Sequence, residues 1–217
     1  MRFRFHPVLI AAALALATGP ALAQQAPMPK DRPPLPGGKA DGPWLQPPSK
    51  LPQVGGDRTK NLDLLFKALK VAHSEPVAKA IETRIWAVWA VSRSDTTMLL
   101  MGRVRKAVEK HDVDLALKLL DAIVKIKPDY VEAWNRRATI YFMKKDYGHA
   151  LSDIREVLKH EPRHFGALSG MALILQEIGD DAHALDVYRR VLTIYPKIER
   201  VPDIVKKLEH KIEGRDI

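Results

Sequence analysis

The sequence has 217 residues, of which 46% are hydrophobic and 28% are charged, with a formal net charge of +9 and no cysteine. The apolar fraction is enough for one sizeable core, but the length does not provide the bulk of a two-domain enzyme. Without cysteine the chain can form neither disulfides nor the lipid attachment of a bacterial lipoprotein. Its basic balance favours acidic partners or anionic surfaces.

Residues 1–23 have the features of a secretory signal peptide. Arg2 and Arg4 give a positive start, an apolar run follows over 8–17, and residues 21–23 read Ala-Leu-Ala, which suits a cleavage site. We therefore expect cleavage before Gln24 and a periplasmic location. The alternative is an uncleaved membrane anchor, although the apolar run is shorter than the roughly 20 residues that a spanning helix needs.

Residues 24–60 are rich in proline and glycine. Nine of the 16 prolines lie between Pro27 and Pro52. Because proline lacks an amide donor and fixes its backbone angle, this composition excludes a stable helix or a central strand. We expect an extended, mostly disordered linker, whose one apolar spot at Trp44 and Leu45 is either unstructured or docked.

Residues 61–94 change to helical periodicity, with apolar residues in two runs that are separated by Ser74 and Pro76. Proline is favoured in the first turn of a helix and serine just before it. This segment is therefore predicted to be a helical hairpin.

A period of 34 residues governs the chain from residue 95 to residue 196. Four residue types recur at this interval: Asp112, Asp146 and Asp180; Ala116, Ala150 and Ala184; Leu117, Leu151 and Leu185; Pro128, Pro162 and Pro196. A fixed period of roughly 20 to 50 residues indicates a repeat array. The sequence thus predicts three units, over 95–128, 129–162 and 163–196.

Each recurrence has a mechanical role in a pair of helices. The aspartate directly precedes an apolar-periodic run, where its carboxylate can accept backbone N–H groups and cap the helix. The small alanine four residues later lets the second helix approach the first closely. The proline ends the second helix, so that each unit is expected to be a helix–turn–helix.

The middle unit carries an additional start signal. Asp129 is followed three residues later by Glu132, which is the spacing of a capping box. Trp134, Ala138 and Tyr141 then share one helical face. We expect the first helix of this unit to begin at Asp129.

These recurrences resemble the tetratricopeptide repeat (TPR). The second unit matches its pattern at Trp134, Ala138, Tyr141, Tyr147, Ala150 and Pro162, and the third at Ala172, Gly179, Ala184, Tyr188 and Pro196. The first unit is a degenerate copy. The resemblance implies an all-α, right-handed α-solenoid of helix–turn–helix pairs, similar to exported TPR proteins of Gram-negative bacteria, which mostly bind proteins.

Helices are also expected on both sides of the repeats. The hairpin at 61–94 is either an N-terminal end piece of the stack or a decayed repeat. Residues 197–217 contain an amphipathic helix that suits the other end as a cap. Binding of this helix to a membrane surface through its basic side is the alternative.

The resemblance further implies a peptide-binding groove lined by the first helix of each unit. By position in the repeat, the groove would carry Met98, Met101 and Arg105, then Asn135, Thr139 and Phe142, then Ser169, Leu173 and Gln176, with Arg136 at its edge. Methionine and aromatic side chains suit apolar peptide residues, while amide and guanidinium groups suit a backbone or a carboxylate. Arg137 stands where the family usually has leucine.

No pattern indicates catalysis, a cofactor or a metal site. The sequence has no glycine-rich phosphate loop and no nucleophile elbow. Pro162 separates His160 from His164 and prevents them from sharing one helical face as metal ligands. His149 and His183 occupy equivalent repeat positions and are interpreted as a solvated surface pair.

We therefore expect a non-enzymatic scaffold or adaptor of the cell envelope, which binds a protein or peptide and no nucleic acid. It is expected to have no transmembrane helix after signal cleavage. The alternative is a structural envelope component that associates with anionic surfaces, such as lipid headgroups, through its basic exterior.

Overall fold

The structure is a computed structural model that describes residues 58–214. Every regular element in this range is a helix: α1 (Arg58–Lys70), α2 (Glu75–Ala90), α3 (Asp95–Glu109), α4 (Val113–Ile126), α5 (Val131–Met143), α6 (Tyr147–His160), α7 (Phe165–Ile178), α8 (Asp181–Ile194) and α9 (Val201–Glu213). The predicted signal peptide and nearly all of the predicted linker lie outside the described residues.

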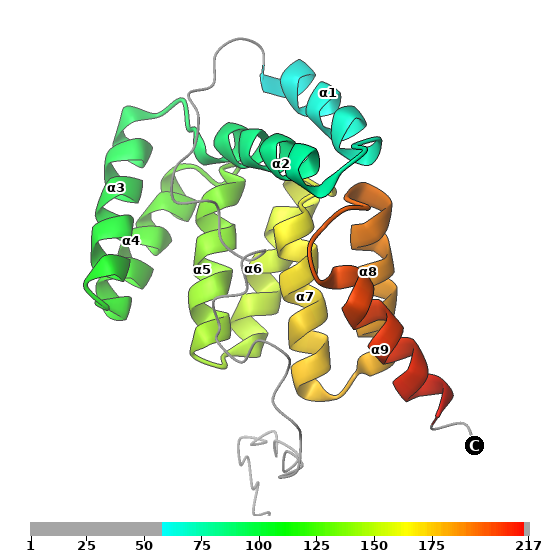
Figure 1. Ribbon diagram of the computed structural model, residues 1–217. Helices are drawn as coiled ribbons and strands as arrows, with labels where there is room; N and C mark the ends of the chain where they lie inside the picture. Colours follow the sequence, from blue (N-terminus) through cyan, green and yellow to red (C-terminus); the bar gives the residue numbers. More distant parts are fainter. Residues whose placement is uncertain (1–57, 215–217) are drawn as a thin grey trace, which may run out of the picture. The chain divides into compact units, whose positions relative to one another are not determined.

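Helices α3 to α8 form three successive pairs (Figure 1). Helix α3 packs on α4, α5 on α6 and α7 on α8, while neighbouring pairs meet through α4 with α5 and α6 with α7. Each pair falls within one 34-residue period. The all-α repeat stack predicted from that period is confirmed.

The turn inside each pair has the same construction three times. One residue per turn adopts a left-handed conformation, with φ of 57°, 59° and 93° at His111, Lys145 and Gly179. The next residue is the aspartate, whose carboxylate accepts the backbone N–H three residues on, at 3.1, 3.2 and 3.2 Å in Asp112, Asp146 and Asp180. Four residues after each aspartate, a fully buried alanine brings the paired helices together.

The capping box predicted at Asp129 and Glu132 is wrong. Helix α5 begins at Val131 with Tyr130 as its N-cap, and no side chain caps it. The Asp129 carboxylate lies 2.8 Å from the Lys127 ammonium instead. Glu132 is buried and its Oε1 lies 2.8 Å from Arg136 Nε, so it does not reach back to the helix start.

The hairpin α1–α2 does not extend the stack beyond α3. It lies across the turns that join successive pairs, and α2 passes over the ends of α5 and α7 (Figure 1). The Trp89 ring stacks on His164 at 3.9 Å between centroids, and the Tyr130 hydroxyl donates to the Ala90 carbonyl at 2.6 Å. Tyr195, which follows α8, donates its hydroxyl to Glu82 Oε2 at 3.0 Å.

A single aromatic core explains this position of the hairpin. Phe66 and Trp86 lie 6.5 and 5.5 Å from the Phe165 ring, measured between centroids. The same hydrophobic cluster continues through α7, α8 and α9. The hairpin therefore braces the second and third repeats, and the expectation that it forms the N-terminal end of the stack is wrong.

Helix α9 covers α8 at the other side. Its Val201, Val205 and Leu208 are buried. Lys211 Nζ lies 2.7 Å from the buried carboxylate of Asp181 in α8, which adds an ion pair to the apolar contact. The amphipathic helix expected at the C-terminal side thus packs on the last repeat.

Candidate functional site

The ten residues predicted to line a groove lie on α3, α5 and α7, but the structure exposes them unequally. Six are at most 9% exposed: Met101, Asn135, Thr139, Ser169, Leu173 and Gln176. Four remain accessible or half-buried: Met98, Arg105, Arg136 and Phe142. The accessible residues come from the first and second repeats only.

The exposure of equivalent groove positions decreases from the first repeat to the third. Met98 and Val108 of α3 are 39% and 43% exposed. Their counterparts in α7, two periods later, are Gly166 and Gln176, and both are buried. The accessible part of the predicted groove is therefore the side of α3 that carries Met98 and Arg105, together with the neighbouring surface of α5. Val108 is not among the predicted groove residues, but it is exposed on the same side of α3 at the position equivalent to Gln176.

The buried groove residues of α5 bond within their own helix. Asn135 Nδ2 donates to Glu132 Oε2 at 3.4 Å, and the Thr139 hydroxyl donates to the Asn135 carbonyl at 2.9 Å. Burial raises the pKa of Glu132, while the charge of Arg136 opposes this shift. The Arg136 side chain keeps 29% of its surface exposed and is the accessible cation of this cluster.

The groove residues of α7 are part of the interior. Gln176 accepts a hydrogen bond from the Tyr188 hydroxyl at 2.9 Å. Leu173 belongs to the aromatic core that holds the hairpin. Ser169 is fully buried, and no described residue bonds its hydroxyl. These three side chains contribute to packing in this structure rather than to an exposed binding surface.

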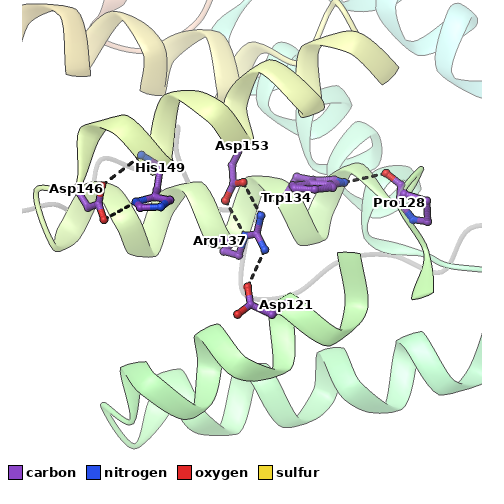
Figure 2. A network of polar contacts seen from close by, with 7 residues as sticks. All are labelled: Asp121, Pro128, Trp134, Arg137, Asp146, His149 and Asp153. Carbon is purple, nitrogen blue, oxygen red and sulfur yellow. Dashed lines mark hydrogen bonds and ion pairs between the residues drawn. The ribbon is translucent and has the colours of Figure 1, made fainter. Parts of the chain in front are cut away.

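Arg137 is the centre of a polar network that joins three helices (Figure 2). Its guanidinium donates twice to Asp153 of α6, at 2.7 and 2.8 Å, and once to Asp121 of α4, at 2.7 Å. The hydrogen bonds and charge of Asp153 raise the pKa of Arg137 further above its usual value, so it stays charged. Trp134 lies beside the guanidinium, 4.8 Å from ring centroid to Cζ, and donates its own N–H to the Pro128 carbonyl.

The sequence contained a signal for this network. Asp121 and Asp153 lie 16 residues before and after Arg137. That spacing is close to half the repeat period, so it places the two carboxylates on the second helices of the preceding and the same repeat. Within a single repeat, Arg137 stands out only as a departure from leucine, and the network becomes visible when two repeats are compared.

The recurrent histidines lie on the surface. His149 Nδ1 is 2.7 Å from Asp146 Oδ2, and the His149 ring stacks on Tyr141 at 5.0 Å between centroids. His183 makes the equivalent contact with Asp180, whose hydrogen bond raises the pKa of His183. Among the described residues no three histidine, cysteine, aspartate or glutamate side chains are grouped to hold a metal ion. Within the same range, no helix is long and apolar enough to cross a membrane.

His164 differs from the other histidines because it is fully buried. Its Nδ1 accepts the Ala167 backbone N–H at 3.0 Å and so caps α7. An acceptor at Nδ1 requires a neutral ring with the proton on Nε2. Burial lowers the pKa of His164 to about 3, which keeps this form at neutral pH.

Comparisons with known proteins identify the repeat. The tetratricopeptide repeat model matches residues 131–164. A TPR repeat-containing protein of Rhizobium etli is 43% identical over 155 residues, which cover 71% of this chain and 76% of the relative. Two solved structures of MamA, one of them a mutant, are 16% and 17% identical and have TM-scores of 0.48 and 0.47. They match over 73% of this chain and 83% and 88% of theirs.

Proposed function

Because the chain belongs to the tetratricopeptide-repeat family, whose members typically act as non-catalytic interaction scaffolds, we propose that it is an adaptor of the cell envelope. It binds a protein or peptide on the accessible part of the groove, formed by α3 and the neighbouring surface of α5. The TPR fold supports the general role of an interaction scaffold. The basic, signal-like N-terminal sequence supports the location.

The observation that carries the choice of surface is the exposed row on α3. Met98 and Val108 flank Arg105 at helical spacing, and all three are exposed. Arg105 lies 3.9 Å from Glu109 in a pair that is largely solvated, so the pair holds it weakly. Two apolar side chains with a weakly paired guanidinium between them suit a peptide that has apolar residues and a carboxylate.

Charge introduced into this row should reduce partner recovery strongly. In affinity purification from envelope extract with crosslinking, we expect the variant Met98→Glu/Val108→Glu to recover its main crosslinked partner at roughly one tenth of the wild-type yield or less. Leu64→Glu is the matched control, because Leu64 is 64% exposed on α1, away from the row. Equal recovery of every partner by wild type and the double variant would remove this surface from consideration.

Export is tested separately from binding. We expect cell fractionation to place the protein in the periplasm, and intact-mass measurement to give a chain that begins at Gln24. A mature protein that retains Met1 and sediments with membranes would contradict cleavage and support an anchored form. A mature protein in the cytoplasmic fraction would contradict the envelope location itself.

A further inference from the structure

The outward side of α3 presents positions that are buried in the other repeats. Leu99 is 62% exposed, whereas its equivalents 34 and 68 residues later, Ala133 and Ala167, are 0% and 1% exposed. Lys106 is exposed, whereas its equivalents Ile140 and Ile174 are buried. We call the surface of Leu99, Arg103 and Lys106 the end face of the stack.

The interface between the first and second repeats shows what such a face normally contacts. Ala133 and Ile140 of α5 share a core cluster with Leu120 and Ile123 of α4. In the third repeat, Ala167 and Ile174 of α7 likewise share a cluster with residues of α6. In the second and third repeats, the surface equivalent to the end face is therefore covered by the second helix of the preceding repeat, which has 14 residues.

The same internal interface defines the charge of an occupant. Arg103 is equivalent to Arg137, which receives the Asp121 carboxylate of α4 at 2.7 Å. Within the described range, neither Arg103 nor Lys106 has an ion pair of its own. Because Lys106 replaces the buried isoleucine of the later repeats, an occupant of the end face has to supply carboxylates opposite two cations.

The hairpin α1–α2 does not cover the end face of α3. Helix α2 lies one repeat before α4 in the sequence, but it packs across the turns of the second and third repeats. The residue equivalent to Asp121 in α2 is Ala87, which is 1% exposed and offers no carboxylate. No described helix other than α4 packs extensively on α3.

We propose that the end face binds an acidic amphipathic helix of another protein, which packs on Leu99 as a preceding repeat would and places carboxylates opposite Arg103 and Lys106. This site is separate from the groove and goes beyond the function proposed above. A second copy of this chain is a poor occupant. Two end faces would oppose cation to cation, and α9 at the other end of the stack exposes Lys206 and Lys207.

A peptide made from α4 provides the probe. It comprises residues 112–128 with the changes Lys118→Glu and Lys125→Glu, both at positions that are exposed in the folded chain, so the apolar face that packs on α5 is preserved. Fluorescence anisotropy with the full chain is expected to show saturable binding that weakens with added salt. The variant Arg103→Glu should bind about tenfold more weakly.

Matched changes separate this site from general attraction to a basic protein. Arg155→Glu makes the same change of charge at an exposed position of α6 and should leave the affinity unchanged. Adding Asp121→Arg to the peptide should restore binding to Arg103→Glu, because the two charges are exchanged. Circular dichroism melting checks that Arg103→Glu is folded.

Three results would overturn the proposal. They are the absence of saturable binding, an equal loss in Arg103→Glu and Arg155→Glu, or failure of the exchanged peptide to restore binding. A concentration-dependent dimer in sedimentation velocity that Arg103→Glu abolishes would instead assign the end face to a second copy. Met98→Glu/Val108→Glu should leave peptide binding intact, so a failure here is distinct from a failure of the groove.

Discussion

Replacing Arg137 by alanine is expected to lower the free energy of unfolding by about 3–4 kcal/mol. The Asp153 side chain is 4% exposed, and Arg137 donates both hydrogen bonds that satisfy its carboxylate. Removing the guanidinium leaves a buried carboxylate without its cation, and desolvation of that charge is then uncompensated. Urea denaturation measures the loss, which corresponds to a melting temperature lower by about 10 °C.

Two further variants test the cause of this loss. Arg155→Ala removes an exposed arginine of α6 and should change the stability by less than about 0.5 kcal/mol. The double variant Arg137→Leu/Asp153→Leu removes both charges and should recover most of the stability, because an apolar pair of similar volume often replaces a buried ion pair without penalty. A double variant as unstable as Arg137→Ala would contradict the explanation by an unpaired charge.

The network also bears on how the repeats are coupled. Asp121 belongs to the first repeat, while Arg137 and Asp153 belong to the second, so one guanidinium joins two units. Asp121 is 46% exposed, and its ion pair contributes less than the buried one. We therefore expect Arg137 to contribute more to the stability of the second repeat than to the stability of the interface between the first and second repeats.

Features that depend on short-range contacts and recur in every repeat could be predicted from the sequence. The aspartate caps, the buried alanines and the helix pairs depend on local contacts, and each occurs three times at one spacing. Repetition distinguishes such a signal from chance: Asp112, Asp146 and Asp180 agree with one another. Asp129 and Glu132 occur only once as a capping box, and each carboxylate pairs with another near neighbour instead, Lys127 and Arg136.

The position of the hairpin could not be predicted in the same way. The helical periodicity of residues 61–94 predicts a buried face, but it does not specify which core the two tryptophans of this segment, Trp86 and Trp89, would join. Their partners His164 and Phe165 lie more than 70 residues away, and the contact is made once, outside the repeat register. The unequal exposure of the groove is likewise a tertiary result, because the exposure of each equivalent position depends on what packs on it.

His164 should make the protein markedly less stable in mild acid. Its pKa of about 3 in the folded chain lies below the value of 6.5 for an unperturbed histidine. Between these two pKa values the unfolded chain binds more protons than the folded chain. The free energy of unfolding therefore decreases as the pH falls below about 6.5. This residue alone should remove about 2 kcal/mol of unfolding free energy between pH 7 and pH 5, measured by urea denaturation at both values.

The structural reason for this sensitivity is the double role of the His164 ring. It stacks on Trp89, meets Trp86 edge to face at 5.3 Å, and accepts the Ala167 N–H through Nδ1. A proton on Nδ1 would remove that acceptor and bury a charge among aromatic rings.

The variant His164→Asn keeps a capping acceptor that does not titrate in this range. It should be less stable at pH 7, but its stability should depend on pH by about 2 kcal/mol less. Surface pairs such as His183 with Asp180 are present in both proteins and cancel in the comparison. An identical pH dependence in the two proteins would show that His164 titrates alike in the folded and unfolded chains.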